Sequence, residues 1–531
     1  MQHPIADSSP EWSAIKAFKL QIEIGLGTNA FEKLRFTFPE LGEIPSIKAL
    51  RSQMESLAGL KPKLYNICQN VCICYTGAHA NATHCPYCKQ PRFRPNGKDP
   101  YRQFPYLPVI PQLQALYANA ETAKAMRHRS EHHLDNAEDP LGTISDIYDA
   151  SHYQSLLDKH VIVDGRRLPH RFFQYPQDVL LVKLTDGFRL FKRGNHTSWP
   201  LIFINANLEP SGRYHVNDVL CVGLIPGPHK PKDFDSFMSI IVEELEKGAI
   251  GVQTYDALID DLCCMHVYAP FGCGDMPAVA MAYTGGKQHN AKHSCRACPM
   301  EGVRVPHSRN PVHYVPVERP PGYPAPVPSY DIHNPPRRKH RSYLAQASLV
   351  DNADSKRDSD RLSTLYGING TPITVRIPGV RFPSSYPFDL MHLLENMFKN
   401  YTLHISGKFK GFDNGVEDYI LSDAAWKEIG ATTAEANRTM PSTFGRKIPN
   451  IAEERTFFTA EAYIVWWTMY APILLQGRFS DVRYYTHIIS FISIVNRCLA
   501  FSSTQAERTK LRSDIITWYQ EYERCVCRDQ I

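Results

Sequence analysis

Five cysteines fall between Cys68 and Cys88, and their spacing is the strongest chemical signal in the chain. Cys68 and Cys72 form one pair, and Cys85 and Cys88 form a Cys-x-x-Cys pair after a short loop. Zinc binds four thiolates tetrahedrally, and two cysteine pairs on turns suit that geometry. The pattern predicts a structural Zn²⁺ site at Cys68, Cys72, Cys85 and Cys88. Because other donors lie nearby, the fourth ligand stays open among Cys88, Cys74, His79 and His84.

The chain has 14 cysteines, and a second close pair is Cys295 with Cys298. In a reducing compartment such clusters bind metal more often than they form disulfides. The isolated cysteines lie in apolar or mixed surroundings, so we expect them to be core thiols. They are Cys221, Cys263, Cys264, Cys273 and Cys498.

Two aspartates follow apolar segments that read as buried strands. Asp186 stands in Leu-Thr-Asp-Gly-Phe, and Asp275 stands in Gly-Asp-Met-Pro-Ala. Two-metal phosphoryl transfer needs carboxylates held together on rigid elements, and a strand end provides such a position. A lone Asp-Gly is more often a simple turn. Spacing alone therefore favours the turn over a catalytic role.

Asp389 and His392 lie one helical turn apart. This spacing allows them to complete a second zinc site with Cys295 and Cys298, which would pin the C-terminal region to the rest of the chain. The alternatives are a helix N-cap for Asp389 and a core histidine for His392. The residues alone favour these alternatives.

Strands and a helix must position these residues. Apolar runs predict strands over 178–185, 199–206, 218–225 and 262–271. Helical spacing predicts a helix over 234–245 with Asp233 as N-cap, and an earlier helix carrying Ile47 and Leu50 with Ser46 as N-cap. Strands alternating with a helix indicate a mixed α/β core.

The chain divides into segments of different composition. Residues 1–60 form a variable N-terminal segment, 61–100 a Cys-rich zinc module and 101–176 a helical linker. Residues 177–298 form the α/β core, 299–387 a Pro/Arg-rich insertion with little core of its own, and 388–531 a helical domain. The insertion carries a basic run that predicts DNA contact, a nuclear signal or a solvated linker: Arg337, Arg338, Lys339 and Arg341.

Composition bounds the class of protein. The 531 residues are 43% hydrophobic, enough for several cores, and the net charge of +5 is a weak indication of nucleic-acid binding. No apolar run is long enough to span a membrane, and residues 1–10 lack the pattern of a secretory signal. We therefore expect a soluble, intracellular protein with no membrane partner.

Taken together, the ordered blocks resemble transposases of CACTA (En/Spm)-type elements and their fungal Plavaka-type relatives. The similarity runs from about residue 60 through nearly the whole chain. The blocks are Tyr65-Asn-Ile-Cys68, Cys85-Pro-Tyr-Cys88, Phe104-Pro-Tyr-Leu-Pro, Leu184-Thr-Asp186-Gly-Phe188, Ser198-Trp-Pro200, Gly223-Leu-Ile-Pro-Gly-Pro228 with Lys230-Pro231, Asp275-Met-Pro-Ala278, Cys295-Arg-Ala-Cys298 and Phe388-Asp-Leu-Met-His392.

The resemblance implies an RNase H-like mixed sheet, interrupted by a helical insertion, with a DDE catalytic triad. Asp186 matches the first acidic residue and Asp275 the second, with Mg²⁺ or Mn²⁺ as cofactor. Cys295, Cys298, Asp389 and His392 match associated metal-binding motifs. The implied partners are transposon ends and target DNA in the nucleus, together with further copies of the chain as a homo-oligomer.

The third acidic residue has no clear match. The resemblance places it on a helix after the helical insertion, and we expect the chain to end at Ile531 before that insertion is complete. Glu461 and Glu395 are the fallback candidates. Loss of one carboxylate would impair a two-metal site. The sequence therefore leaves two hypotheses: a DDE transposase, intact or inactivated, and a non-catalytic zinc-containing remnant that binds DNA or protein.

Overall fold

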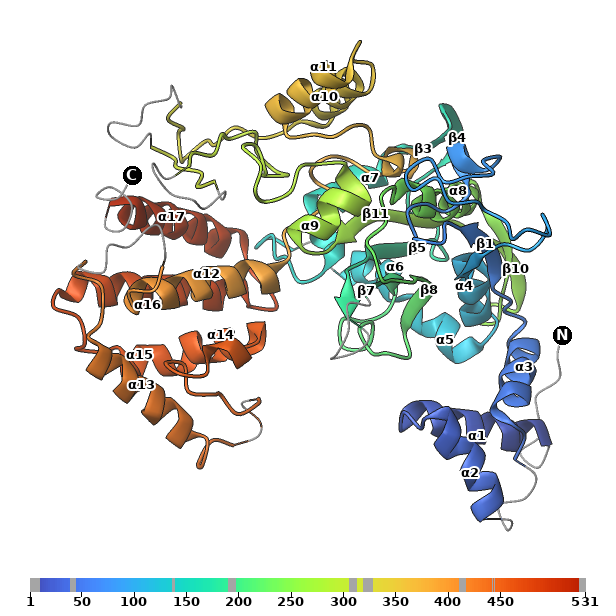
Figure 1. Ribbon diagram of the computed structural model, residues 1–531, viewed down its shortest axis with the longest axis horizontal. Coiled ribbons are helices and arrows are strands. Elements are labelled where there is room, and N and C mark those ends of the chain that lie inside the picture. Colours follow the sequence, from blue (N-terminus) through green and yellow to red (C-terminus); the bar gives the residue numbers. More distant parts are fainter. Residues whose placement is uncertain are drawn as a thin grey trace.

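The computed structural model describes residues 10–38, 44–135, 139–189, 197–304, 313–318, 328–409, 417–441, 443 and 445–524. A body built around a β-sheet lies between a small group of N-terminal helices and a larger group of C-terminal helices (Figure 1). No helix among these residues is long and apolar enough to cross a membrane.

The N-terminal helices have a small core of their own, made by Ala14, Phe31, Ile47 and Leu50. The predicted helix is α3, and Ser46 caps it, since its Oγ accepts a hydrogen bond from the Ala49 N–H at 3.2 Å. The three helices are α1 (Pro10–Glu23), α2 (Thr28–Thr37) and α3 (Ile47–Ala58).

The central sheet has seven strands, in the order β1-β2-β8-β7-β5-β11, with β6 paired to β7. Only the β5–β11 pair is parallel; the other pairs are antiparallel. Because β1 and β2 belong to this sheet, the sheet begins well before residue 177. The strands are β1 (Lys63–Ile67), β2 (Arg102–Tyr106), β5 (Val179–Leu184), β6 (Phe188–Arg189), β7 (Thr197–Asn205), β8 (Val219–Ile225) and β11 (Val267–Cys273).

Helix α8 (Asp235–Ile250) connects the antiparallel part of the sheet toward β11 and packs on it through Phe237, Ile241 and Leu245. The N-cap of α8 is Phe234 and not the predicted Asp233; Asp233 lies one residue before it and accepts the Ser236 N–H at 3.0 Å. Shorter helices pack around the same core or beside it. They are α4 (Val109–Tyr117), α5 (Ala120–Ala125), α6 (His128–Asp135), α7 (Ser151–Leu157) and α9 (Met276–Val279), which continues as a π-helix over Ala280–Thr284.

One predicted strand is wrong in its extent. The run over 262–271 is two strands in different sheets, β10 (Asp261–Met265) and β11, separated at His266. Strand β10 pairs with β9 (Val252–Asp256), and β3 (His160–Val163) pairs with β4 (Arg166–Arg171) in a second hairpin. A continuous apolar pattern cannot show such a break, because the residues on both sides of it are apolar.

Residues of the predicted insertion contribute to the core of the sheet. Helices α10 (His340–Asp351) and α11 (Lys356–Tyr366) precede a 3-10 helix over Ile373–Arg376. The Tyr386 ring of this segment stacks on the Tyr283 ring, with 5.7 Å between the ring centroids, and the Phe382 ring stacks on Tyr386. The sequence predicts an insertion with little core of its own; in the structure the buried side chains of this segment belong to the core of the sheet.

The C-terminal region is helical, as predicted, and has a separate core. Trp466 and Trp467 are fully buried there, and their indole N–H groups donate to Thr433 Oγ1 at 3.0 Å and Thr402 Oγ1 at 3.1 Å. The helices are α12 (Leu390–Ile405), α13 (Asp423–Ala436), α14 (Ala460–Val465), α15 (Ala471–Leu474), α16 (Val482–Cys498) and α17 (Gln505–Tyr522), with a π-helix over Trp466–Tyr470 joining α14 to α15.

Candidate metal centre and acidic site

The four predicted zinc ligands converge. The sulfur atoms of Cys68, Cys72, Cys85 and Cys88 all lie within 4.8 Å of one another, and Cys68 Sγ is 3.3 Å from Cys88 Sγ. Tetrahedral zinc with Zn–S bonds of about 2.3 Å places its sulfurs roughly 3.8 Å apart. The geometry and the chemistry of the donors fit a zinc ion, so this cluster can hold a metal such as zinc.

Burial opposes the ionisation of two thiols of the cluster. It raises the pKa of Cys68 to about 11 and that of Cys72 further, because a thiolate is poorly solvated there. A divalent cation at the centre would offset this cost and ionise the thiols. The three alternative ligands have other partners: Cys74 Sγ faces Asn66 O at 3.6 Å, His79 pairs with Asp233, and His84 pairs with Thr83.

The Cys-rich module is attached to the start of α8. The Cys72 carbonyl accepts the N–H groups of Lys232 and Asp233 at 3.0 Å each. The Cys74 N–H donates to Ser236 Oγ at 2.9 Å, and His79 Nε2 lies 2.8 Å from Asp233 Oδ2. The module is therefore part of the sheet body and not a separate appendage.

The two predicted acidic residues lie at one edge of the sheet. In the parallel β5–β11 pair Leu184 is opposite Cys273, and Asp186 and Asp275 each follow two residues later. Parallel neighbours end at the same edge, so this register puts both aspartates side by side at the carboxyl ends of the strands. Both aspartates lie in the loops that leave these strands, and the two carboxylates are close enough for the charge of Asp275 to affect Asp186.

Each aspartate uses one oxygen to hold its own loop. Asp186 Oδ1 accepts the Gly187 N–H, and Asp275 Oδ1 accepts the Ala278 N–H as the N-cap of α9, both at 2.6 Å. Partial burial and the charges of Asp275 and Asp389 raise the pKa of Asp186, although Gly187 and His392 oppose the shift. The edge therefore concentrates negative charge that a divalent cation would offset.

Asp389 and His392 approach the same edge from the C-terminal region. Asp389 is the N-cap of α12, accepting the Met391 N–H at 2.9 Å, which is the structural role that the sequence left open. Its Oδ2 is 2.6 Å from His392 Nδ1. Partial burial lowers the pKa of His392, but the hydrogen bond and charge of Asp389 and the charge of Asp275 raise it overall.

The structure does not bring the second predicted zinc site together. Cys295 and Cys298 share a hydrogen bond that lowers the pKa of Cys295 to about 6. Within the described parts of the chain, however, the only set of three or more ligands within 4.8 Å is the first cysteine cluster. The pair Cys295–Cys298 and the pair Asp389–His392 are therefore each formed, but not as one ligand set.

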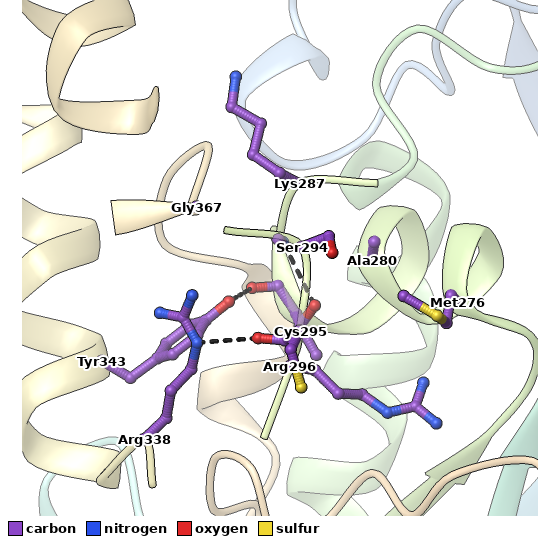
Figure 2. A pocket seen from close by; sticks show the side chains of 11 residues that line it. Met276, Ala280, Lys287, Ser294, Cys295, Arg296, Arg338, Tyr343 and Gly367 are labelled. Carbon is purple, nitrogen blue, oxygen red and sulfur yellow. Dashed lines mark hydrogen bonds between the residues drawn. The ribbon is translucent and has the colours of Figure 1, made fainter. Parts of the chain in front are cut away.

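Arg296 connects these two pairs. Its Nη2 donates to Pro387 O at 2.5 Å, and its guanidinium lies 4.8 Å from the Phe388 ring. In the pocket of Figure 2 its side chain extends away from Arg338 and Tyr343. Arg296 Nε and Nη1 are buried, and neither has a hydrogen-bond partner among the residues that the structure describes. The positive charge of the Arg296 guanidinium therefore lies near the negative charges of Asp389 and Asp275.

Residues 163–317 match the family described as "Transposase family tnp2". No curated protein matches the chain. The matched segment contains β5 to β11 and both aspartates of the sheet edge, and it supports a transposase.

The remaining predicted residues of this candidate transposase lie elsewhere. Arg338 is buried, and its Nε donates to Cys295 O at 3.0 Å, so its position does not suit the predicted contact with DNA (Figure 2). Arg337, Lys339 and Arg341 are exposed, and their DNA contact stays a prediction. Glu461 is exposed in the first turn of α14, and Glu395 lies on α12 one turn beyond His392.

The sequence assigned no role to two lysines of the matched segment. Lys230 lines a pocket beside Tyr87 of the Cys-rich module, and partial burial lowers its pKa although Asp275 attracts its charge. Lys183 is fully buried in β5, where burial lowers its pKa to about 7. A lysine within an apolar strand was the available signal for Lys183, and for Lys230 the signal was its place in the block Lys230-Pro231, to which the sequence assigned no role.

Proposed function

We propose that the chain is a DNA transposase of DDE type, in which Asp186 and Asp275 hold the divalent cations of DNA strand cleavage and transfer. The observation that carries the proposal is the parallel β5–β11 register, which sets both carboxylates at one sheet edge within the family match. The strand order β8-β7-β5-β11, with α8 leading to the parallel strand, supports an RNase H-like core.

Both carboxylates suit a hard cation. Each aspartate keeps one oxygen in a loop hydrogen bond and leaves the other for the cation. Bound Mg²⁺ or Mn²⁺ would supply Lewis-acid activation of water and of the leaving 3′ oxygen. The role of the protein is to hold the two carboxylates at a fixed separation and to place Arg296 and His392 beside them.

The third acidic residue stays unassigned. Among the residues that the structure describes, no third donor completes a close ligand set with Asp186 and Asp275. This observation favours a second candidate function, a transposase-derived protein that retains its zinc module and binds DNA without cutting it. In both cases transposon DNA is the partner that we propose, and the nucleus is the place of action.

Nicking of a supercoiled plasmid in Mg²⁺ or Mn²⁺ tests the proposal. We expect nicking by the unaltered chain and its loss, by at least about 100-fold, in Asp186→Asn and in Asp275→Asn. Asp218→Asn is the matched control, because Asp218 precedes β8 at the opposite edge of the sheet. Nicking that survives Asp186→Asn contradicts the assignment, and DNA binding without nicking identifies the non-catalytic alternative.

A further inference from the structure

A second group of reactive side chains lies at the other end of the same two strands. Val179 and Val267 open β5 and β11 and are opposite each other, so the residues before them, Asp178 and His266, are also neighbours. His266 Nδ1 is 2.8 Å from Asp178 Oδ1, and His266 Nε2 is 3.7 Å from Cys264 Sγ. Asp178, His266 and Cys264 thus form a carboxylate–imidazole–thiol relay.

The relay has a fixed orientation. Asp178 is fully buried, and its second oxygen accepts the Tyr175 N–H at 3.0 Å. The His170 ring packs on His266 with 4.0 Å between centroids. Since a buried carboxylate at Nδ1 keeps the proton on that nitrogen, Nε2 presents its lone pair to the thiol.

The thiol end of the relay is open. The sequence predicts a core thiol at Cys264, but this residue is exposed, while His266 behind it is only 3% exposed. Gly251, with φ of +116°, lies beside both groups. A Cβ there would come within 2.5 Å of Cys264 Sγ and 3.0 Å of His266 Nε2, so any other residue at position 251 would push the thiol and the ring out of place.

An apolar surface adjoins the thiol. Leu262 precedes Cys264 by two residues, so both side chains lie on one face of the β9–β10 hairpin. Leu262 is opposite Tyr255 in the hairpin register, and Leu262 is 58% exposed. Ile250, next to Gly251, is also largely exposed. A ligand whose reactive group reaches Cys264 can therefore lay an apolar chain on Leu262 and Tyr255.

We propose that Cys264 is an acyl-acceptor site that takes an apolar acyl group from a thioester, with His266 as general base and Asp178 as the group that orients it. Cys264 Sγ attacks the thioester carbonyl while its proton passes to His266 Nε2. The C–S bond of the donor then breaks, and its thiolate leaves with the proton from His266. The products are an acyl-thioester on Cys264 and a free thiol, so the exchange needs no oxidant or reductant.

Protonation explains why the base is required. Partial burial and the charge of Asp178 raise the pKa of Cys264 above its ordinary value. The resting group is therefore a thiol rather than a thiolate, and it becomes a good nucleophile only as His266 accepts the proton. The site does not depend on the acidic edge, because the whole of β5 separates Asp178 from Asp186.

The chain contains a matched control for the test. Cys221 on β8 is also exposed, but within the part of the chain that the structure describes its sulfur forms a hydrogen bond to the Gly223 carbonyl, at 3.7 Å, and none to a histidine. The full chain is incubated with the hexanoyl thioester of N-acetylcysteamine near neutral pH, and peptide mass spectrometry follows acylation of each cysteine. We expect Cys264 to be acylated at least about 10-fold faster than Cys221. Equal rates overturn the proposal without any variant.

Two variants separate the base from the apolar surface. His266→Gln should slow acylation of Cys264 on the order of 100-fold and leave Cys221 unchanged. Leu262→Ser, at an exposed position, should reduce the preference for a hexanoyl over an acetyl donor at Cys264. An unchanged Cys264 rate in folded His266→Gln contradicts the role of the base. If that variant does not fold, an unchanged chain-length preference in Leu262→Ser contradicts the apolar acyl class.

Discussion

At the scale of single residues, the close carboxylates of the acidic edge should lower the stability of the metal-free chain and favour binding of a cation. Asp186 and Asp275 repel each other, and Asp389 adds a third negative charge nearby. His392 and Arg296 offset part of this charge. Arrangements that are unfavourable without a ligand are common at functional sites, so these residues should respond to substitution in a way that structural residues do not.

Asp186→Asn is expected to stabilise the metal-free chain at neutral pH. The pKa of Asp186 is raised, so the folded state holds this proton more tightly than the unfolded state does. Its contribution to stability is therefore present at low pH and is lost as the pH rises through the raised pKa. Urea denaturation should show a higher midpoint for the variant at pH 7 and a smaller difference at pH 4.

The control for this prediction is Asp139→Asn. The pKa of Asp139 is lowered by hydrogen bonds from Thr143 and Leu141, so its ionised form stabilises the fold. That variant should be less stable at pH 7, the opposite sign. A lower urea midpoint for Asp186→Asn at pH 7 would show that the acidic edge is not electrostatically strained.

At the scale of elements, the Cys-rich module and the sheet support each other. We expect the module to be stabilised by a bound metal, since the cluster of thiols is buried and the segment offers little other core. It contacts α8 through Cys72, Cys74 and His79. Loss of the metal should therefore alter the structure at the start of α8, close to the loop that carries Lys230.

Cys85→Ser should remove bound zinc. We expect about one zinc per chain in the unaltered protein and close to none in the variant, because a structural site needs all four ligands. Cys74→Ser is the matched control: Cys74 is equally buried but lies outside the ligand set. Elemental analysis after dialysis measures both, and zinc lost only in Cys74→Ser would show that the ligand set is wrong.

The contact between His79 and Asp233 should hold the module on α8. Asp233→Ala removes this pair and a hydrogen bond to Ser236, at a cost of roughly 1–2 kcal/mol. Limited trypsin digestion should then cut faster after the exposed Lys89 and Arg94 of the module. Unchanged cleavage at these sites, with cleavage elsewhere as reference, would mean that the backbone bonds of Cys72 suffice.

Much of this arrangement could be predicted from sequence because its signals are local. The spacing of the two cysteine pairs predicts the metal ligands, with the fourth left open, and the apolar run of β5 predicts the position of Asp186 relative to its strand. The break at His266 could not be read, because it depends on which sheet each half joins. Nor could the burial of Arg338 or the openness of Cys264, since both depend on distant segments packing beside them.

At the scale of the whole molecule, two large cores meet near the acidic edge. The sheet core and the C-terminal helical core are separate clusters, and the start of α12 approaches the sheet through the Arg296 contacts. The two cores are also joined where Ile144 and Ser503 exchange backbone hydrogen bonds at 2.9 and 3.0 Å. The helical core can therefore set the position of Asp389 and His392 without contributing to the sheet.

Trp467→Ala should unfold the helical core preferentially. Trp467 is fully buried and stacks on Phe398 with 5.5 Å between centroids, so its removal is expected to cost about 3–5 kcal/mol. Calorimetry should show the loss in one of two transitions, with the zinc content unchanged. Ile473→Ala, at a 74% exposed position, should change neither transition. Equal loss in both transitions would show that the two cores unfold as one unit.

The central claim is that Asp186 and Asp275 belong to one divalent-cation site. Titration of the zinc-loaded chain with Mn²⁺, followed by electron paramagnetic resonance of the free ion, tests it without requiring cleavage. We predict that Asp186→Asn and Asp275→Asn each weaken Mn²⁺ binding by at least about tenfold, because each removes one carboxylate ligand, while Asp218→Asn binds as the unaltered chain does. Equal Mn²⁺ affinity in all four proteins would contradict the account.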